Sequence, residues 1–118
     1  MPRYALAQLD ALAPRACPCG TARRAFADQP GAPASVHLVE IKLDAEAHFH
    51  TRTTEIYVVL EGEGWIELDG ERIPVRPLST VMIRPGCVHR AVGPLRLLNL
   101  VVPPFDPADE DPADSPPP

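Results

Sequence analysis

Short alternating segments separated by turn residues are the feature that most constrains the fold of this chain. Apolar and polar residues alternate with a period of two over residues 37–43, which is typical of a strand with one buried face. Asp69-Gly70 lies between two further segments and is a strong hairpin signal, and Pro85-Gly86 and Gly93-Pro94 mark other turns. The pattern predicts strands over residues 37–43, 56–60, 64–68, 72–75, 80–83, 89–92 and 95–102.

No helical period of useful length interrupts these segments, so we expect an all-β barrel or sandwich. Residues 1–34 carry several Pro and Gly and predict an irregular N-terminal arm, in which residues 4–13 fit a short helix or an extended chain and residues 23–27 a short strand. Residues 35–103 form the expected β domain. Residues 104–118 predict a tail that is disordered from about residue 106, because Pro, Asp and Ala bury too little apolar surface to offset the entropy of ordering.

The composition excludes several classes of partner. The 118 residues suffice for one domain. All 11 Lys and Arg precede residue 103, whereas five acids follow it, so the net charge of −5 comes from the tail and no nucleic-acid partner is expected. No apolar run of about 18 residues predicts a membrane span. Three cysteines do not suit a disulfide framework and no secretory signal is evident, so a reducing cytoplasm is the expected setting.

Three of the four histidines form a pattern that can hold a metal. His48 and His50 are two residues apart, so on a strand both side chains leave the same face. Glu55 follows after a plausible turn, and His89 can approach from a third segment. Imidazole nitrogens with a carboxylate suit divalent Fe, Mn, Ni, Cu or Zn, and four ligands leave about two open positions on an octahedral ion. A His-x-His pair by itself is more often a pair of ordinary half-buried strand residues.

The joint pattern resembles the cupin family. Residues 48–55, HFHTRTTE, continuing to Gly62, look like the first cupin motif, and residues 84–89, RPGCVH, look like the second. Residues 57–64, YVVLEGEG, and Asp69-Gly70-Glu71 are also typical of the strands between the two motifs. The resemblance covers about residues 35–103. Departures from the usual family residues at Lys42, Leu78, Arg84 and Gly93 concern turns and packing rather than ligands.

The resemblance implies a double-stranded β-helix, the jelly-roll β-barrel of cupins, with one divalent transition metal inside it. It implies that the ligands are His48, His50, Glu55 and His89, and it implies a homodimer. Within the family, such a site implies an enzyme that acts on a small polar metabolite. Dioxygenase-type oxidation is slightly favoured, because the sequence shows no clear carboxylate besides Glu55 to serve as a base. A redox-neutral sugar isomerase or epimerase, or a non-catalytic small-molecule-binding cupin, are the alternatives.

Further residues are candidates with weaker support. By strand parity Tyr57 shares the inward face of Glu55 and Met82 is expected to line the barrel. Arg84 can bind an anionic substrate if it points inward. We therefore predict Tyr57, Met82 and Arg84 as substrate-binding residues. Cys87 is expected to be a small buried residue. Cys17 and Cys19 admit a metal or redox role, although loop cysteines are the favoured interpretation.

Overall fold

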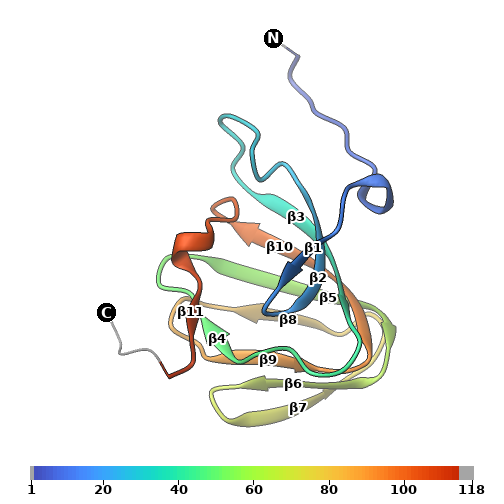
Figure 1. The fold of residues 1–118 in the computed structure, drawn as a ribbon, viewed down its shortest axis with the longest axis vertical. Coiled ribbons are helices and arrows are strands. Elements are labelled where there is room, and N and C mark those ends of the chain that lie inside the picture. The colour runs from blue at the N-terminus through green and yellow to red at the C-terminus, as the bar shows by residue number, and fades with distance from the viewer. Residues whose placement is uncertain (1, 115–118) are drawn as a thin grey trace.

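The structure is a computed structural model that describes residues 2–114, and these residues form two antiparallel sheets that face each other (Figure 1). Strands make up nearly all of the regular structure, with two single turns of 3-10 helix. In chain order the elements are η1 (Leu9–Ala11), β1 (Arg15–Cys17), β2 (Gly20–Ala25), β3 (Ser35–Ile41), β4 (His48–Phe49), β5 (Thr54–Gly62), β6 (Gly64–Leu68), β7 (Glu71–Val75), β8 (Thr80–Ile83), β9 (His89–Val92), β10 (Leu95–Val102), η2 (Pro107–Asp109) and β11 (Asp111–Pro112).

The order of strands is that of a jelly-roll barrel. One sheet has the order β1-β2-β3-β10-β5-β8 and the other β11-β4-β9-β6-β7, so strands distant in sequence lie side by side in each. The all-β prediction is confirmed, and β8, β9 and β10 have the predicted bounds. The β6–β7 hairpin turns at Asp69 and Gly70, whose φ angles of 49° and 87° explain why an Asp-Gly pair stands there.

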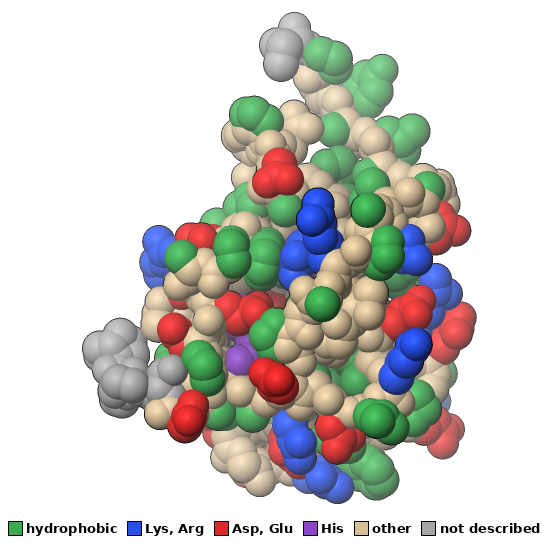
Figure 2. Space-filling view, in the orientation of Figure 1, with side chains coloured by type: hydrophobic (Ala, Val, Ile, Leu, Met, Phe, Trp, Pro, Cys, Tyr) green, Lys and Arg blue, Asp and Glu red, His purple; other side chains and the backbone are tan. Residues whose placement is uncertain are grey.

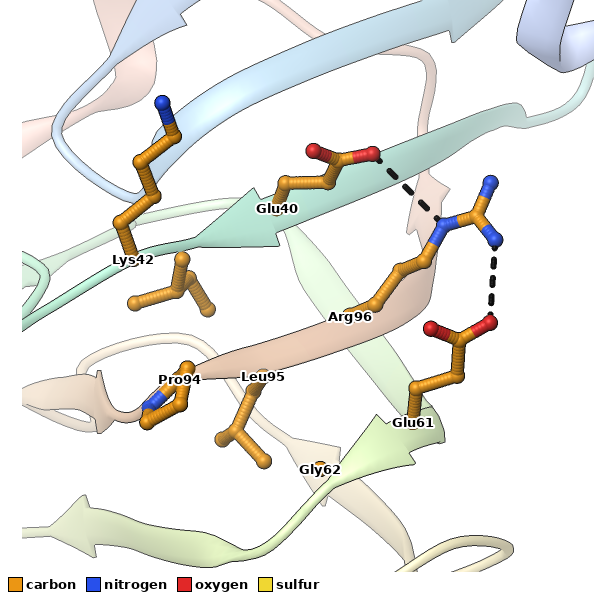
Figure 3. Close-up of a pocket in the computed structure, with 8 residues that line it drawn as sticks. Glu40, Lys42, Glu61, Gly62, Pro94, Leu95 and Arg96 are labelled. Carbon is orange, nitrogen blue, oxygen red and sulfur yellow. Dashed lines mark hydrogen bonds and ion pairs between the residues drawn. The ribbon is translucent and has the colours of Figure 1, made fainter.

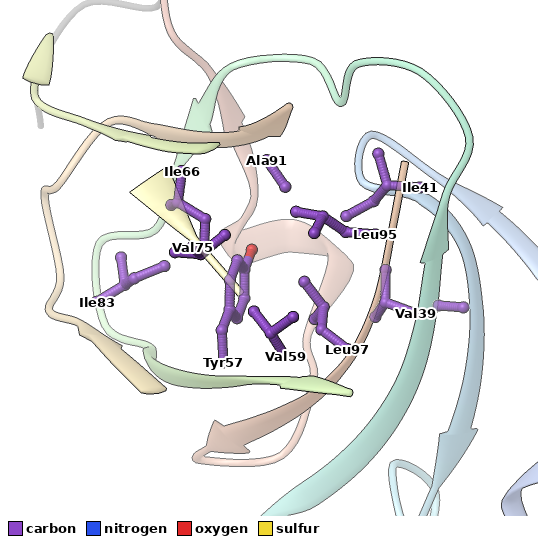
Figure 4. Packing of buried hydrophobic residues seen from close by; sticks show 11 residues of the cluster. Val39, Ile41, Tyr57, Val59, Ile66, Val75, Ile83, Ala91, Leu95 and Leu97 are labelled. Atoms are coloured by element: carbon purple, nitrogen blue, oxygen red, sulfur yellow. The ribbon is translucent and has the colours of Figure 1, made fainter. Parts of the chain in front are cut away.

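The core fills the space between the sheets (Figure 4). In β5 the inward residues Glu55, Tyr57 and Val59 are buried, whereas Ile56 and Val58 on the other face are half-buried. This alternation is what a period of two predicts for a sheet with one buried face. The apolar part of the core is at one end of the barrel, built around Val39, Val59, Ile66, Leu95 and Leu97. The polar inward residues lie at the other end.

The N-terminal region is more regular than expected. β1 and β2 form a hairpin, and β2 pairs with β3 along Thr21–Ala25, so this part of the chain extends the larger sheet. The strand predicted over residues 23–27 therefore begins earlier and ends at Ala25. Only its second half was predicted, because the nearby Pro18, Gly20 and Pro30 are turn residues. Residues 4–13 are extended except for the single turn η1.

The C-terminal tail, expected to be disordered from about residue 106, has regular structure as far as residue 112. Here the chain forms η2 and then β11, which pairs with β4. Asp109 is 2% exposed and accepts hydrogen bonds from the Thr51 and Arg52 amides and from the Thr53 hydroxyl. The composition argument counted only apolar burial, whereas a buried carboxylate with several donors orders this segment. Residues 115–118 lie outside the described residues.

The two neighbouring cysteines differ from the favoured interpretation. Cys17 and Cys19 flank Pro18 in the turn between β1 and β2, and a disulfide joins them. Cys87 is a free thiol that is partly buried against the core, close to its expected role. Within residues 2–114, no helix has the length and apolar character needed to cross a membrane.

Candidate metal centre

The four predicted ligands meet at the polar end of the barrel. His48 comes from β4, Glu55 from β5 and His89 from β9, while His50 follows β4 directly. One potential ligand atom from each lies within 4.8 Å of all the others, and every one of the four residues is buried. β4 and β9 pair at His48 and His89, which brings these two imidazoles to a ring-centroid separation of 4.4 Å.

Each imidazole of the cluster is fixed by a backbone carbonyl. Nδ1 of His48 lies 2.8 Å from the Glu46 oxygen, and Nδ1 of His89 lies 2.9 Å from the Cys87 oxygen. Nδ1 of His50 lies 2.6 Å from the Asp109 oxygen. A carbonyl oxygen only accepts, so each Nδ1 carries the hydrogen and each Nε2 is left with its lone pair. Metal-binding histidines are oriented in this way by their outer neighbours.

The bare Nε2 atoms face a carboxylate. Nε2 of His50 and Nε2 of His89 each lie 2.9 Å from Oε1 of Glu55. Nε2 of His50 is buried and makes no hydrogen bond of acceptable geometry with a described residue. Lone pairs of two nitrogens and a carboxylate oxygen repel one another at this distance, so the cluster requires a cation among them, either a proton or a metal ion. The donor set therefore fits a divalent transition metal.

The electrostatics of the cluster follow from burial and from Glu55. Burial would raise the pKa of Glu55, but the neighbouring imidazoles of His50 and His89 hold that pKa well below its usual range. Burial lowers the pKa of His48 to about 4, and the neighbouring His89 adds to this effect. Burial also opposes protonation of His50, but Glu55 outweighs it and raises the pKa of that imidazole. An anionic Glu55 beside neutral imidazoles is the state that binds a metal.

Two residues that support the cluster were missed by sequence reasoning. The Asn99 side-chain amide donates to Oε2 of Glu55, the carboxylate oxygen that does not face the histidines. Asp109 holds the turn between His50 and Glu55, and its own carbonyl orients His50. An Asn inside the apolar run of residues 95–102 was a visible signal, since inward polar residues in such a strand need a partner. The composition of the tail gave no signal that Asp109 supports the cluster.

The predicted substrate-binding residues have different positions. Tyr57 is inward and 4% exposed, packed in the core with its ring 6.0 Å from that of His89. Met82 is 58% exposed on the outside of β8, so the inward assignment is wrong by one residue of register. Arg84 is also exposed and makes no side-chain hydrogen bond or ion pair within residues 2–114, so the structure does not bring it to the cluster.

Two hollows lie on the surface, one at Arg96 and one beside the C-terminal segment. A shallow one of about 390 Å³ lies at Arg96, whose guanidinium is already paired with Glu40 and Glu61 on the outer face (Figure 3). A larger one of about 600 Å³ lies between β1 and the C-terminal segment and is lined by Arg24, Phe105 and Glu110, among others. On this face a histidine is visible in a recess with acidic side chains beside it (Figure 2). We call this second hollow the tail-side hollow.

Comparison with known proteins agrees with this geometry. A family model described as Cupin domain matches residues 35–101. The chain belongs to the cupin family. Among curated proteins, an uncharacterized protein of Methanocaldococcus jannaschii is 35% identical over 68 residues, which are 54% of each chain, so this cupin spans about half the length of that relative.

Solved structures share the whole fold. A protein from Planctomyces limnophilus superposes with a TM-score of 0.85 at 42% identity, covering 94% of this chain and 96% of that one. Streptomyces PAC13 with uridine has a TM-score of 0.82 at 18% identity over 96% and 92%, and Pac13 is described as a nucleoside dehydratase. Ectoine synthase from P. lautus has a TM-score of 0.73 at 18% identity over 98% and 94%. The last two likenesses concern the fold alone.

Proposed function

We propose that this cupin is a metal-dependent enzyme that acts on a small polar metabolite at one divalent transition metal. His48, His50, Glu55 and His89 are the residues that would hold the ion. The observation that carries the proposal is the orientation of the three imidazoles, each tied through Nδ1 to a backbone carbonyl so that Nε2 faces Glu55. A bound ion would polarise an oxygen atom of the substrate, since four protein ligands leave room for one.

Glu110 bears on the class of reaction. The sequence favoured oxidation only because it showed no carboxylate besides Glu55. Glu110 lines the tail-side hollow, burial raises its pKa, and the charges of His50 and Glu55 act on it. A carboxyl group with a raised pKa beside the reaction site suits proton transfer. We therefore place redox-neutral proton transfer, as in isomerisation, epimerisation or elimination, ahead of dioxygen-dependent oxidation.

In that reaction each residue of the site has a separate role. Glu55 and the imidazoles fix the position of the ion, and Asn99 fixes the carboxylate of Glu55. Glu110 takes a proton from the substrate at its carboxylate oxygen and returns it elsewhere. The apolar residues behind the cluster, with Tyr57 among them, keep water out of the inner end of the barrel.

Metal content tests the proposal. Elemental analysis of untagged protein should give close to one ion per chain in the wild type, and His50→Ala should lose most of it while staying folded by circular dichroism. The matched control is His37→Gln, which removes a buried histidine outside the cluster and should keep the metal. Absence of metal from the wild type after reconstitution under reducing conditions would reject the metalloenzyme and favour a ligand-binding barrel.

The metal-loaded protein then separates the reaction classes. Exchange of substrate hydrogen with deuterated solvent, lost in Glu110→Gln at unchanged metal content, is the result expected for proton transfer. Iron in the site with substrate-dependent oxygen uptake that survives Glu110→Gln would instead support oxidation.

A further inference from the structure

Arg24 is an unpaired, half-buried cation on the inner face of the larger sheet. Its guanidinium carbon lies 4.0 Å from the centre of the Phe105 ring, and its Nε is fully buried without a hydrogen-bond partner among the described residues. No ion pair of Arg24 occurs within residues 2–114. Stacking on an aromatic ring fixes the plane of a guanidinium and leaves its edge free for a planar anion.

The position of Arg24 is set by strand register. Arg24 of β2 pairs with His37 of β3, His37 pairs with Asn99 of β10, and Asn99 pairs with Tyr57 of β5. The four residues form one row across the sheet, and Asn99 in that row bonds to the metal ligand Glu55. Two strand spacings separate Arg24 from Asn99, which is roughly 10 Å between their Cα atoms. Arg24 therefore lies within the length of a small metabolite from the cluster.

The tail-side hollow lies at the Arg24 end of this row. Arg24, Phe105 and Glu110 line it, and the charge of Glu110 acts on Arg24 as well as on His50, Glu55 and His89. Glu110 is therefore near both the guanidinium and the cluster. Arg15 and Asp28 lie at the exposed rim. A molecule in the hollow meets the guanidinium of Arg24 and the carboxyl group of Glu110.

We propose that the tail-side hollow is the substrate site and that Arg24 binds the carboxylate of a small monocarboxylic acid whose other end reaches the cluster. The proposal rests on the proposed function for the role of that other end. A single negative charge matches the half-buried guanidinium of Arg24, whereas a phosphate dianion would place its second charge toward Glu110. The other guanidinium at this hollow, that of Arg15, lies at the exposed rim. The planar carboxylate also accepts two parallel hydrogen bonds from a stacked guanidinium.

Ligand-detected NMR tests the proposal with monocarboxylates of two to six carbons, each paired with its neutral amide, and with inorganic phosphate. At least one carboxylate should bind the wild type more tightly than its amide and more tightly than phosphate. Arg24→Gln should weaken that binding about tenfold or more, because a charge-assisted pair is lost. Arg84→Gln removes an exposed, unpaired arginine and should bind as the wild type does.

Several outcomes would overturn the assignment of Arg24. They are equal binding to the wild type and to Arg24→Gln, tighter binding of phosphate or of the amides, and no binding of any carboxylate by the wild type. Melting temperatures identify an unfolded variant, and Arg24→Lys, which keeps the charge without the planar edge, then serves in its place with an intermediate affinity expected. The titrations are repeated after chelator treatment, and the metal content is measured each time. If the protein never holds metal but still binds the carboxylate through Arg24, the proposed function is rejected and the assignment of Arg24 is kept.

Discussion

At the scale of single residues, Asn99 links the candidate metal centre to the sheet behind it. Its amide bonds to the outer oxygen of Glu55, and it is 6% exposed. Outer partners of this kind orient the ligand and sustain its basicity. The residue would thus act on a bound metal through Glu55 and is not itself one of the four candidate ligands.

Asn99→Leu should therefore weaken metal binding about ten- to a hundredfold without removing a ligand. Competition with a chromophoric chelator measures the affinity. The control is Tyr57→Phe, because Tyr57 pairs with Asn99 across β5 and β10 and makes no hydrogen bond with a described residue. Equal affinities of the wild type and Asn99→Leu would show that Glu55 does not need this support.

His37 makes the stability of the barrel depend on pH. Burial lowers its pKa to about 4, and the charge of Arg24 adds to that effect. Between the ordinary value of 6.5 and about 4, the unfolded chain binds a proton that the folded chain does not. Stability should therefore fall as the pH falls through this window, by up to about 3 kcal/mol from this residue, and it should change no further from this source below pH 4.

Urea unfolding of metal-free protein at several pH values checks this expectation. His37→Gln should show a shallower loss of stability between pH 6.5 and 4 than the wild type. His48, whose pKa burial also lowers to about 4, contributes to both proteins and cancels in the comparison. Parallel curves for the two proteins would exclude His37 as the cause.

At the scale of elements, the C-terminal segment closes one side of the metal centre. Asp109 joins η2 to the turn before β5 through bonds to Thr51 and Thr53, while β11 pairs with β4. Burial would raise the pKa of Asp109, but the hydrogen bonds from these threonines hold it well below its usual range. The carboxylate is therefore ionised at neutral pH and stabilises the segment in place.

Asp109→Asn should destabilise the protein by about 2–4 kcal/mol, because an amide nitrogen would replace an acceptor that several buried donors need. It should also release the C-terminal segment to proteases. Chemical unfolding and limited proteolysis measure both effects. Asp114→Asn is the matched control, since Asp114 is exposed in the same segment. If the two variants behaved alike, the order of the segment would rest on β11 and not on Asp109.

At the scale of the whole molecule, the outer face of the larger sheet carries an apolar patch beside the ion pairs of Arg96. Ile56, Val58, Leu98 and Leu100 are half-buried there, and Met82 is 58% exposed. The N-terminal arm covers only part of this face, near Leu38 and Leu98, and its own end extends away from the barrel (Figure 1). We propose that two copies of the chain pair through this face, because monomers seldom expose a contiguous apolar patch of this kind.

Light scattering should then give twice the mass of the chain, and Leu98→Glu should give a monomer. Leu78→Glu, in an exposed loop at 78% exposure, should leave the dimer intact. A wild type whose mass stays that of one chain over a wide range of concentrations would contradict the pairing.

The sequence by itself determined the barrel and the identity of the four clustered side chains. Alternation fixes which residues of β3, β5 and β10 face inward, and the turn at Asp69-Gly70 fixes a hairpin, since both depend on neighbours in the chain. His48, His50, Glu55 and His89 were predicted to lie together because the two motifs that contain them resemble those of cupins.

Tertiary structure alone decided what surrounds the cluster. Met82 was misplaced because the register of β8 is set by its pairing with β5, which a four-residue strand does not reveal. Asp109 and the first half of β2 come from segments whose composition indicates loop or disorder, and they are ordered by partners about 15 to 60 residues away in the chain. The ligand set follows from the resemblance of two motifs to those of cupins, whereas the tail-side hollow follows from long-range pairing.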